Sequence, residues 1–255
     1  MHPMLNIGIR AAHAAGDHIV RYVDRIEGMT VDSKGLNDFV SEVDKQAESI
    51  IIDHIRKAYP AHGILAEESG AHPGDEYQWV IDPLDGTTNF LHGFPQFAVS
   101  IGLLHKGVPD QAVIYDPLRQ ELFVASKGAG AQLNNRKIRV SKQRELKGSL
   151  LGTGFPYSNM DGLEQYLDNF RKLCPITAGI RRAGAASLDL AYVACGRLDG
   201  FWESGLKPWD IAAGVLLILE AGGTVSDIDK SENYLRSGNI VAGNLQITDG
   251  LLKIF

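Results

Sequence analysis

The chain has 255 residues, 44% of them hydrophobic, so it can bury a large core without disulfide bonds or structural metals. Its formal net charge of −6 at pH 7 gives no overall attraction for nucleic acid, so we expect a small-molecule or protein partner and no direct DNA binding. Two cysteines without metal-type spacing, no basic leader and no run of about 18 apolar residues disfavour a zinc knuckle, export and a membrane span. We expect a cytoplasmic protein.

Two helices are predicted at the start of the chain. Apolar residues recur at helical spacing over residues 5–25 and again over 41–58, where Ser41 is a candidate N-cap. Between about 64 and 140 the pattern changes to short β-rich runs separated by Gly, Pro and Asn, namely ILA, WVI, FAVSIGLL, QAVIY, ELFVA and AQL. These runs predict a mostly antiparallel sheet. The GAGAQL segment is interpreted as a hairpin turn, because it lacks the ending of a phosphate-binding loop.

A second α/β layer is predicted after about residue 145. Strand-like runs SLLGTG, DGFWE, GTVSD and NIVAG alternate there with helical segments at 160–173, 187–195, 208–221 and 247–254. The polar segment at 140–148 is too short for a flexible linker. We therefore expect an N-terminal α+β half, residues 1–143, and a C-terminal α/β half, residues 144–255, packed as one unit.

Two carboxylates end a predicted buried strand in WVIDPLDGTTNF, residues 79–90. Asp82 and Asp85 are costly to bury there unless they are hydrogen-bonded, paired or bound to a cation, and neither has a local Lys or Arg. Pro83 stiffens the turn and can direct the Leu84 carbonyl toward the same space. Oxygen ligands without His or Cys suit Mg²⁺.

The residues after these aspartates suit an anion. Gly86 permits close backbone approach, and a short helix beginning near Thr87 would offer free N–H groups to a phosphate. The alternative is an Asx turn in which the aspartates only cap the backbone. The alternative explains each residue separately, but the whole DPLDGTTN string favours a site for metal and phosphate.

Other acidic residues must join from distant parts of the sequence. Glu67 and Glu68 follow the strand-like GILA, and Asp210 begins a predicted helix in KPWDIAAG, where a first-turn acid is also favoured by the helix dipole. Asp44, in SEVDKQAE, would by itself be interpreted as part of a solvated helical face.

GILAEES, WVIDPLDGTTNF and KPWDIAAGVLLILEAGG resemble the signature segments of the inositol monophosphatase family of Mg²⁺-dependent phosphatases, over essentially the whole chain. KGLNDFVSEVDKQAE, SLDLAYVACGRLDGFWE and SGNIVAGN resemble the bacterial suppressor-type branch of that family. The resemblance implies an α+β layered sandwich of alternating α-β-α-β-α layers, similar to fructose-1,6-bisphosphatase. It also implies a homodimer with two to three Mg²⁺ per site and sensitivity to lithium.

The resemblance also implies roles for individual residues. The implied ligands of one Mg²⁺ are Glu67, Asp82 and the Leu84 carbonyl; those of a second are Asp82, Asp85 and Asp210; a third, weaker ion lies on the Glu67 side. The implied catalytic group is Thr87, Asp44 and Glu67, with Thr87 and Asp44 orienting the attacking water. The implied substrate-binding residues are Gly86 and Thr87, whose amides hold phosphate, Ala186 and Glu203, which contact inositol hydroxyls, and Asp85.

The implied function is hydrolysis of inositol 1-phosphate to myo-inositol and phosphate. Substrates that related enzymes take, 3'-phosphoadenosine 5'-phosphate or a sugar bisphosphate, remain open as alternatives. Eight histidines without HxH or HExxH spacing disfavour a zinc hydrolase. Ser100 and Ser187 lack a GxSxG elbow, so they are predicted to serve packing or capping.

A binding role is implied as well. Suppressor-type proteins are associated with the RNA polymerase antitermination machinery and its Nus factors, and Arg181 and Arg182 are candidates for such a partner surface. The alternatives are a solvated basic pair or contacts across the homodimer.

Overall fold

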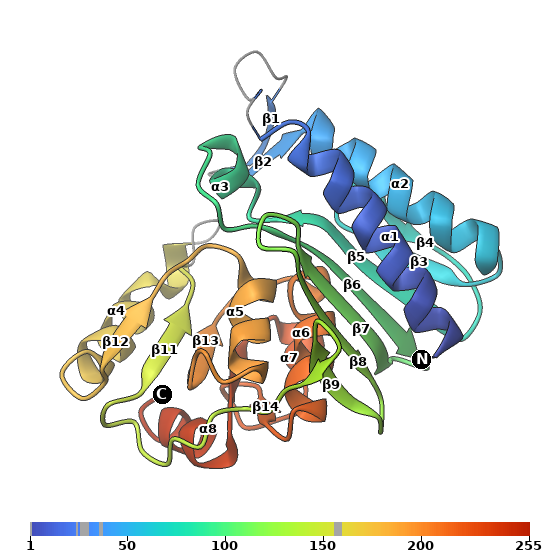
Figure 1. The fold of residues 1–255 in the computed structure, drawn as a ribbon. Helices are drawn as coiled ribbons and strands as arrows, with labels where there is room; N and C mark the ends of the chain where they lie inside the picture. The colour runs from blue at the N-terminus through green and yellow to red at the C-terminus, as the bar shows by residue number, and fades with distance from the viewer. Residues whose placement is uncertain (1, 24, 26–30, 36–37, 156–159) are drawn as a thin grey trace.

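The computed structural model describes the backbone of residues 2–23, 25, 31–35, 38–155 and 160–255, and their side chains apart from those of 31–40 and 161 (Figure 1). Two helices lie side by side at the N-terminal end: α1 (Pro3–Val20) and α2 (Glu42–Ala58). Between these helices in the sequence, the short strands β1 (Val31–Gly35) and β2 (Asp38–Ser41) pair with each other. The helix α2 begins after Ser41 as predicted, whereas α1 ends before the predicted residue 25.

The first large sheet has eight strands in the order β10-β9-β8-β7-β6-β5-β3-β4. They are β3 (Gly63–Ala66), β4 (Gly70–His72), β5 (Tyr77–Asp85), β6 (Ala98–His105), β7 (Val108–Asp116), β8 (Glu121–Ser126), β9 (Gly130–Leu133) and β10 (Arg136–Lys137). Neighbours are antiparallel, as predicted, except that β3 and β5 run parallel. The parallel pair brings the ends of β3 and β5 to the same edge of the sheet. The predicted hairpin turn connects β8 and β9.

The second sheet has five strands in the order β12-β11-β13-β15-β14. They are β11 (Leu150–Thr153), β12 (Gly179–Arg181), β13 (Gly200–Glu203), β14 (Thr224–Ser226) and β15 (Ile240–Gly243). The accompanying helices are α4 (Leu163–Leu173), α5 (Ala186–Ala194), α6 (Pro208–Glu220), α7 (Tyr234–Ser237) and α8 (Leu245–Leu252). The four predicted strands and four predicted helices of this part are all present, whereas β12 and α7 were not predicted.

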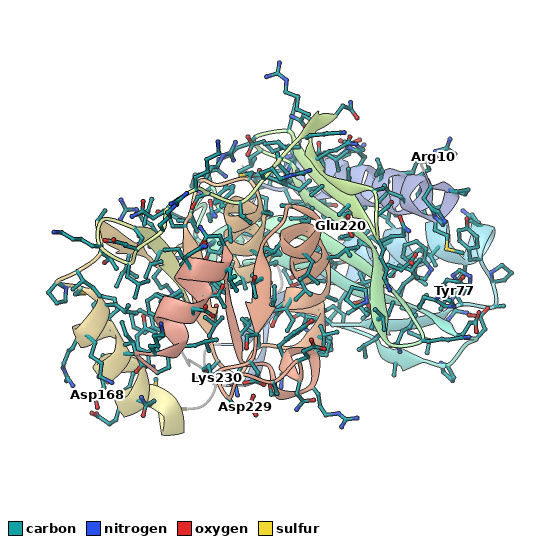
Figure 2. All side chains as sticks on the ribbon, turned by 90° about the horizontal axis from the view of Figure 1, so that it is seen from below. Arg10, Tyr77, Asp168, Glu220, Asp229 and Lys230 are labelled. Atoms are coloured by element: carbon teal, nitrogen blue, oxygen red, sulfur yellow. The ribbon has the colours of Figure 1, made fainter. Side chains whose placement is uncertain are left out.

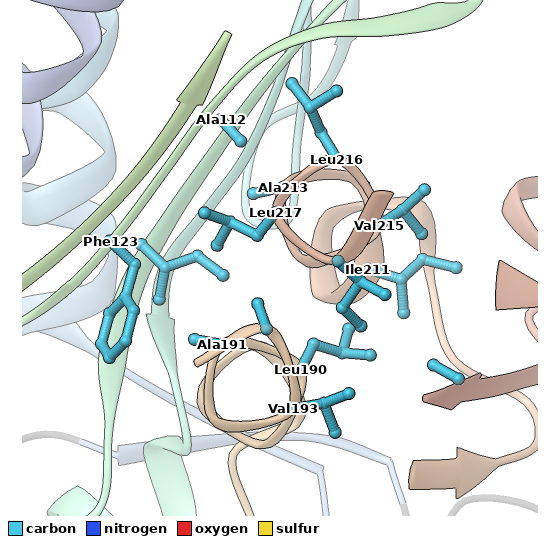
Figure 3. Packing of buried hydrophobic residues seen from close by; sticks show 14 of the residues in the cluster. Ala112, Phe123, Leu190, Ala191, Val193, Ile211, Ala213, Val215, Leu216 and Leu217 are labelled. Carbon is cyan, nitrogen blue, oxygen red and sulfur yellow. The ribbon is translucent and has the colours of Figure 1, made fainter. Parts of the chain in front are cut away.

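The helices α5 and α6 lie between the two sheets and fill the centre of the molecule (Figure 3). A Cβ on Gly214 of α6 would lie 2.5 Å from the Leu190 side chain of α5, so the two helices approach closely only because Gly214 has no side chain. Leu190 and Ile211 are fully buried, and each such side chain stabilises the fold by about 1.5–3 kcal/mol.

The layers alternate through the molecule. The helices α1 and α2 cover one face of the first sheet, α5 and α6 separate the two sheets, and α4 and α8 cover the outer face of the second. The predicted α-β-α-β-α sandwich is confirmed. None of the described helices is both long and apolar enough to span a bilayer.

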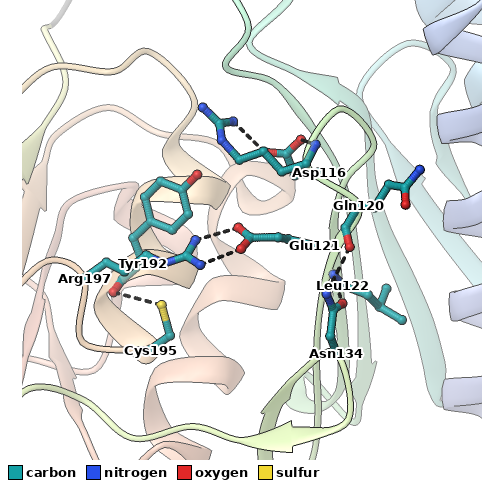
Figure 4. A network of polar contacts seen from close by, with 9 residues as sticks. Asp116, Gln120, Glu121, Leu122, Asn134, Tyr192, Cys195 and Arg197 are labelled. Atoms are coloured by element: carbon teal, nitrogen blue, oxygen red, sulfur yellow. Dashed lines mark hydrogen bonds and ion pairs between the residues drawn. The ribbon is translucent and has the colours of Figure 1, made fainter.

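Charged side chains join the first sheet to the helices behind it. Arg197, just after α5, donates through both terminal nitrogens to the carboxylate of Glu121 on β8, and its guanidinium carbon lies 5.0 Å from the centre of the Tyr192 ring (Figure 4). Glu220, labelled in Figure 2, lies at the end of α6. It accepts backbone N–H bonds from Gly128 and Gly130 at 2.7 Å each. These contacts fix the β8–β9 hairpin against the helical layer.

Candidate active site

A bulge shapes the end of β5. Asp82 pairs with Ser100 of β6 and Asp85 with Ala98, and the register shifts between these pairs, so Pro83 and other intervening residues bulge out of the ladder. Asp82 Oδ1 accepts a hydrogen bond from the Leu84 N–H at 3.0 Å. The Asx-type turn is therefore real, but Asp82 is also only 2% exposed, and one backbone hydrogen bond does not offset the burial of a charge.

Asp85 connects the strand to a helix far along the chain. Its Oδ2 accepts hydrogen bonds from the Ser187 N–H at 2.8 Å and from the Ser187 hydroxyl at 2.5 Å, across 102 residues. Burial raises the pKa of Asp85 to about 6, although hydrogen bonds from Ser187 and from the Ala186 amide act in the opposite direction. Ser187 was predicted to serve packing or capping; it is fully buried, and it does not cap α5 with its own side chain but donates both its N–H and its hydroxyl to Asp85. Ala186, 8% exposed, is the first residue of α5, and its amide faces Asp85.

Asp44 is completely buried, so the interpretation of its segment as a solvated helical face is wrong for this residue. Its Oδ2 accepts hydrogen bonds from the N–H of Ser41 at 2.9 Å and from the Ser41 hydroxyl, while its Oδ1 accepts from the Thr87 hydroxyl at 2.9 Å. The same hydroxyl lies 3.0 Å from the Leu84 carbonyl oxygen. Burial raises the pKa of Asp44, and these hydrogen bonds partly offset that effect.

Gly86 has a backbone conformation that other residues rarely adopt. Its φ is 91°, and an added Cβ would lie 2.8 Å from the Gln96 carbonyl oxygen. The short helix α3 (Thr87–Leu91) begins directly after it, as predicted. Asn89 donates through Nδ2 to the carbonyls of Gln96 at 2.7 Å and Ala183 at 2.9 Å, and so ties the helix to the segment before α5.

The remaining predicted metal ligands converge on Asp82. Glu67 follows β3, and its N–H donates to the Ile81 carbonyl at 3.1 Å. Burial raises the pKa of Asp82 well above its usual range, and the negative charges of Glu67, Asp85 and Asp210 raise it further, as does a hydrogen bond with Glu67. Asp210 is the third residue of α6, and its Oδ2 accepts a hydrogen bond from the Lys207 N–H at 2.6 Å. The structure therefore brings all four predicted carboxylates within electrostatic reach of one another.

This donor set fits a divalent cation. Within the described residues, no three or more His, Cys, Asp or Glu side chains have a ready-made coordination geometry, so the fit depends on chemistry and charge. Carboxylate and carbonyl oxygens are the ligands that Mg²⁺ prefers. Burial and then the repulsion of neighbouring carboxylates raise the pKa of both Asp82 and Asp210, and a bound cation reverses that repulsion.

A second group of acids lies beside the first. Burial raises the pKa of Glu203, at the end of β13, well above its usual range, and Asp189 and Asp210 add to this, whereas Arg182 lowers it. An added Cβ on Gly154 would lie 1.8 Å from a Glu203 carboxyl oxygen, so the Glu203 side chain occupies space that only glycine leaves open. Asp189, 2% exposed, was missed by the sequence analysis, although an acid in the otherwise apolar ASLDLAYVA helix was an available signal.

The two arginines of the expected partner surface have different surroundings. Both are exposed, and Arg181 ends β12 at the edge of the second sheet. The guanidinium carbon of Arg182 lies 5.8 Å from the centre of the Phe155 ring, and its charge lowers the pKa of Glu203 and Asp189. Arg182 is therefore electrostatically coupled to the acidic group, and both exposed arginines stay candidates for the partner surface.

Comparisons with known proteins agree with this arrangement. The model described as the inositol monophosphatase family matches residues 1–255. The chain belongs to this family. A protein of Pseudomonas aeruginosa named Nus factor SuhB is 55% identical over an alignment of 258 positions, which covers 99% of this chain and 95% of that protein.

Two solved structures are similar throughout. The extragenic suppressor protein SuhB of Bartonella henselae has a TM-score of 0.96 and 44% identity, covering 99% of this chain and 98% of that one. The inositol monophosphatase of Anabaena has a TM-score of 0.88 and 45% identity, covering 98% of this chain and 94% of that one. The inositol monophosphatase fold and the suppressor-type resemblance are thus both supported over the whole chain.

Proposed function

We propose that this protein is a cytoplasmic, Mg²⁺-dependent phosphomonoesterase that hydrolyses inositol 1-phosphate to myo-inositol and phosphate. The observation that carries the proposal is the burial of Asp82 among Glu67, Asp85 and Asp210, next to the hydrogen bond between Thr87 and Asp44. A structural role explains one buried carboxylate, but it gives no reason to gather four in one place.

The four carboxylates and the Leu84 carbonyl are the groups that would hold Mg²⁺. When bound, the ions neutralise the negative charge of the phosphate and make a nearby water more acidic. The N–H groups at Gly86 and Thr87, at the start of α3, bind phosphate oxygens. No residue of the chain acts as a nucleophile in this reaction, because water attacks phosphorus directly.

The pair Thr87 and Asp44 orients the attacking water. With its proton donated to Asp44 Oδ1, the Thr87 oxygen is free to accept a hydrogen bond from water and point a lone pair of that water at phosphorus. The raised pKa of Asp44 suits it to take up the proton that leaves the water through Thr87. Glu203 and the start of α5 at Ala186 bind the inositol hydroxyls, and the charge of Arg182 partly offsets the burial that raises the pKa of Glu203.

Phosphate release from several substrates tests the proposal. Inositol 1-phosphate, fructose 1,6-bisphosphate and 3'-phosphoadenosine 5'-phosphate are compared at saturating Mg²⁺, and we expect inositol 1-phosphate to give the highest kcat/KM. A higher value for either bisphosphate would overturn the substrate while keeping the chemistry. No Mg²⁺-dependent release from any of them would refute the enzyme assignment.

A second function is favoured by the 55% identity to a relative named Nus factor SuhB. We propose that a homodimer of this protein also binds the RNA polymerase antitermination machinery, through a surface that includes Arg181. Light scattering tests the dimer, and copurification with RNA polymerase and Nus factors tests the partner. Asp82→Asn protein should copurify as well as wild type, and loss of binding in this variant would indicate a shared site.

A further inference from the structure

A buried carboxylate that the proposed chemistry does not use lies one helical turn beyond Asp44. Glu48 of α2 is 3% exposed, and it accepts backbone N–H bonds from Glu68 at 2.8 Å and from Ser69 at 2.9 Å, one on each carboxylate oxygen. These two amides directly follow Glu67 in the chain. The residue thus holds the segment that leaves β3 at the point where the proposed metal ligand projects.

We propose that Glu48 is a positioning residue for Mg²⁺ binding, which acts by fixing the backbone that carries Glu67. This inference rests on the proposed function. Residues four apart lie on the same face of a helix, so α2 directs Asp44 at Thr87 and Glu48 at the Glu67 segment from one rigid surface. The side chains that act on water and on the ion are therefore held in register by a single helix.

The reach of the Glu48 side chain is what the proposal depends on. A carboxylate accepts on both oxygens, whereas the amide of a glutamine accepts on one oxygen and presents N–H groups on the other side. Glu48→Gln therefore breaks one of the two backbone bonds and sets a donor against a donor. Glu48→Asp keeps the negative charge but is one methylene shorter, so it cannot span both amides without moving them.

Glu220 provides a matched control. It also lies on a helix and accepts two backbone N–H bonds, one on each oxygen, from Gly128 and Gly130, but these belong to the β8–β9 hairpin. Glu220→Gln makes the same chemical change in a carboxylate that accepts two backbone N–H bonds but holds no proposed metal ligand. A general effect of loosening the fold would appear in both proteins, whereas a positioning effect appears only in the Glu48 variants.

The experiment measures the Kd of Mn²⁺ by the EPR signal of the free ion, together with Tm and the Mg²⁺ dependence of phosphate release. We expect Glu48→Gln and Glu48→Asp each to weaken Mn²⁺ binding by about 10-fold or more, as is typical for residues that orient a metal ligand. Glu220→Gln should bind Mn²⁺ as wild type does. At saturating Mg²⁺ the KM for inositol 1-phosphate should change little in any variant.

Other results would overturn the inference. If the Kd for Mn²⁺ is unchanged in both Glu48 variants, whatever their Tm, the hydrogen bonds from the Glu68 and Ser69 amides to Glu48 are only structural. Weakening in Glu48→Gln alone would assign the effect to lost charge, and equal weakening in Glu220→Gln would assign it to general loosening. If the Glu48 variants do not fold, the amides of Glu68 and Ser69 are followed in wild type by hydrogen exchange, and failure of Mn²⁺ to slow their exchange overturns the inference. Wild-type protein that binds no Mn²⁺ would refute the metal-dependent function as well.

Discussion

Replacing Thr87 by valine tests the proposed handling of water. The substitution exchanges a hydroxyl for a methyl group on a side chain of nearly the same shape, at the first residue of α3, and leaves the backbone amide in place. The hydroxyl lies 2.9 Å from Asp44 Oδ1 and 3.0 Å from the Leu84 carbonyl oxygen, so the change removes a side-chain atom that links Asp44 to this segment. No proposed metal ligand is altered in charge.

Two magnitudes follow from these contacts. A positioned group that accepts a proton in the transition state contributes about 10²–10⁴-fold to the rate, and each tenfold corresponds to about 1.36 kcal/mol, so the barrier should rise by about 2.7–5.4 kcal/mol. Asp44 keeps its two bonds from Ser41 but loses the one from Thr87. The loss of one partner of a buried acceptor should lower the free energy of unfolding by about 1–3 kcal/mol.

The assay compares kcat and KM for inositol 1-phosphate in wild type, Thr87→Val and Thr87→Ser at saturating Mg²⁺, with urea unfolding of each. Serine restores the hydroxyl, so we expect Thr87→Ser to keep most of the activity and Thr87→Val to lose it through kcat. A Thr87→Val protein that is folded and turns over at nearly the wild-type kcat would remove the hydroxyl from the mechanism. Equal loss in the serine and valine variants would point to packing instead.

Three further changes test other parts of the structure. Asp82→Asn should abolish Mg²⁺-dependent phosphate release while circular dichroism shows a retained fold, and near-wild-type turnover would remove Asp82 from the metal site. Gly154→Ala should raise the KM for inositol 1-phosphate, because the new methyl would displace the Glu203 carboxylate, and an unchanged KM would show that Glu203 does not contact the substrate. Hydrogen bonding with Arg197 lowers the pKa of Glu121, so the pair stabilises the fold above the unfolded pKa of this group and ceases to do so as pH falls through the lowered value. Glu121→Gln should therefore lower the free energy of urea unfolding by about 1 kcal/mol at neutral pH and by much less in acid; a loss that is the same at both would contradict this reasoning.

Local sequence patterns predicted most of the fold. The apolar run FAVSIGLL and the helical spacing over 41–58 are patterns of residues close together in the chain. The strand β6 and the helix α2 could therefore be predicted from them. The strands β4 and β12 were missed because GAH and GIR contain no apolar run, and only pairing with adjacent strands extends them.

The parts of the site formed by residues close in sequence could be predicted. The parts in which tertiary packing determines the burial or the partner of a residue were harder to predict. Asp82 and Asp85 stand out from their strand, whereas the burial of Asp44 and Glu48 depends on how α2 lies against the sheet. The bond between Ser187 and Asp85 joins groups 102 residues apart, and no local pattern contains that information.

Three of the acidic residues also have a structural role. This role limits what their presence says about whether a member of the family is catalytically active. Asp44, Asp85 and Asp210 each accept a backbone N–H at the start of a helix, respectively α2, α5 and α6. Selection for folding alone retains such residues, because losing a helix cap typically costs about 0.5–2 kcal/mol. A descendant that gave up turnover and kept only a binding role would still carry these aspartates. Thr87 caps no helix, but its hydroxyl holds Asp44 and lies against the Leu84 carbonyl, so selection for folding retains it as well, and none of these four residues alone marks a working phosphatase.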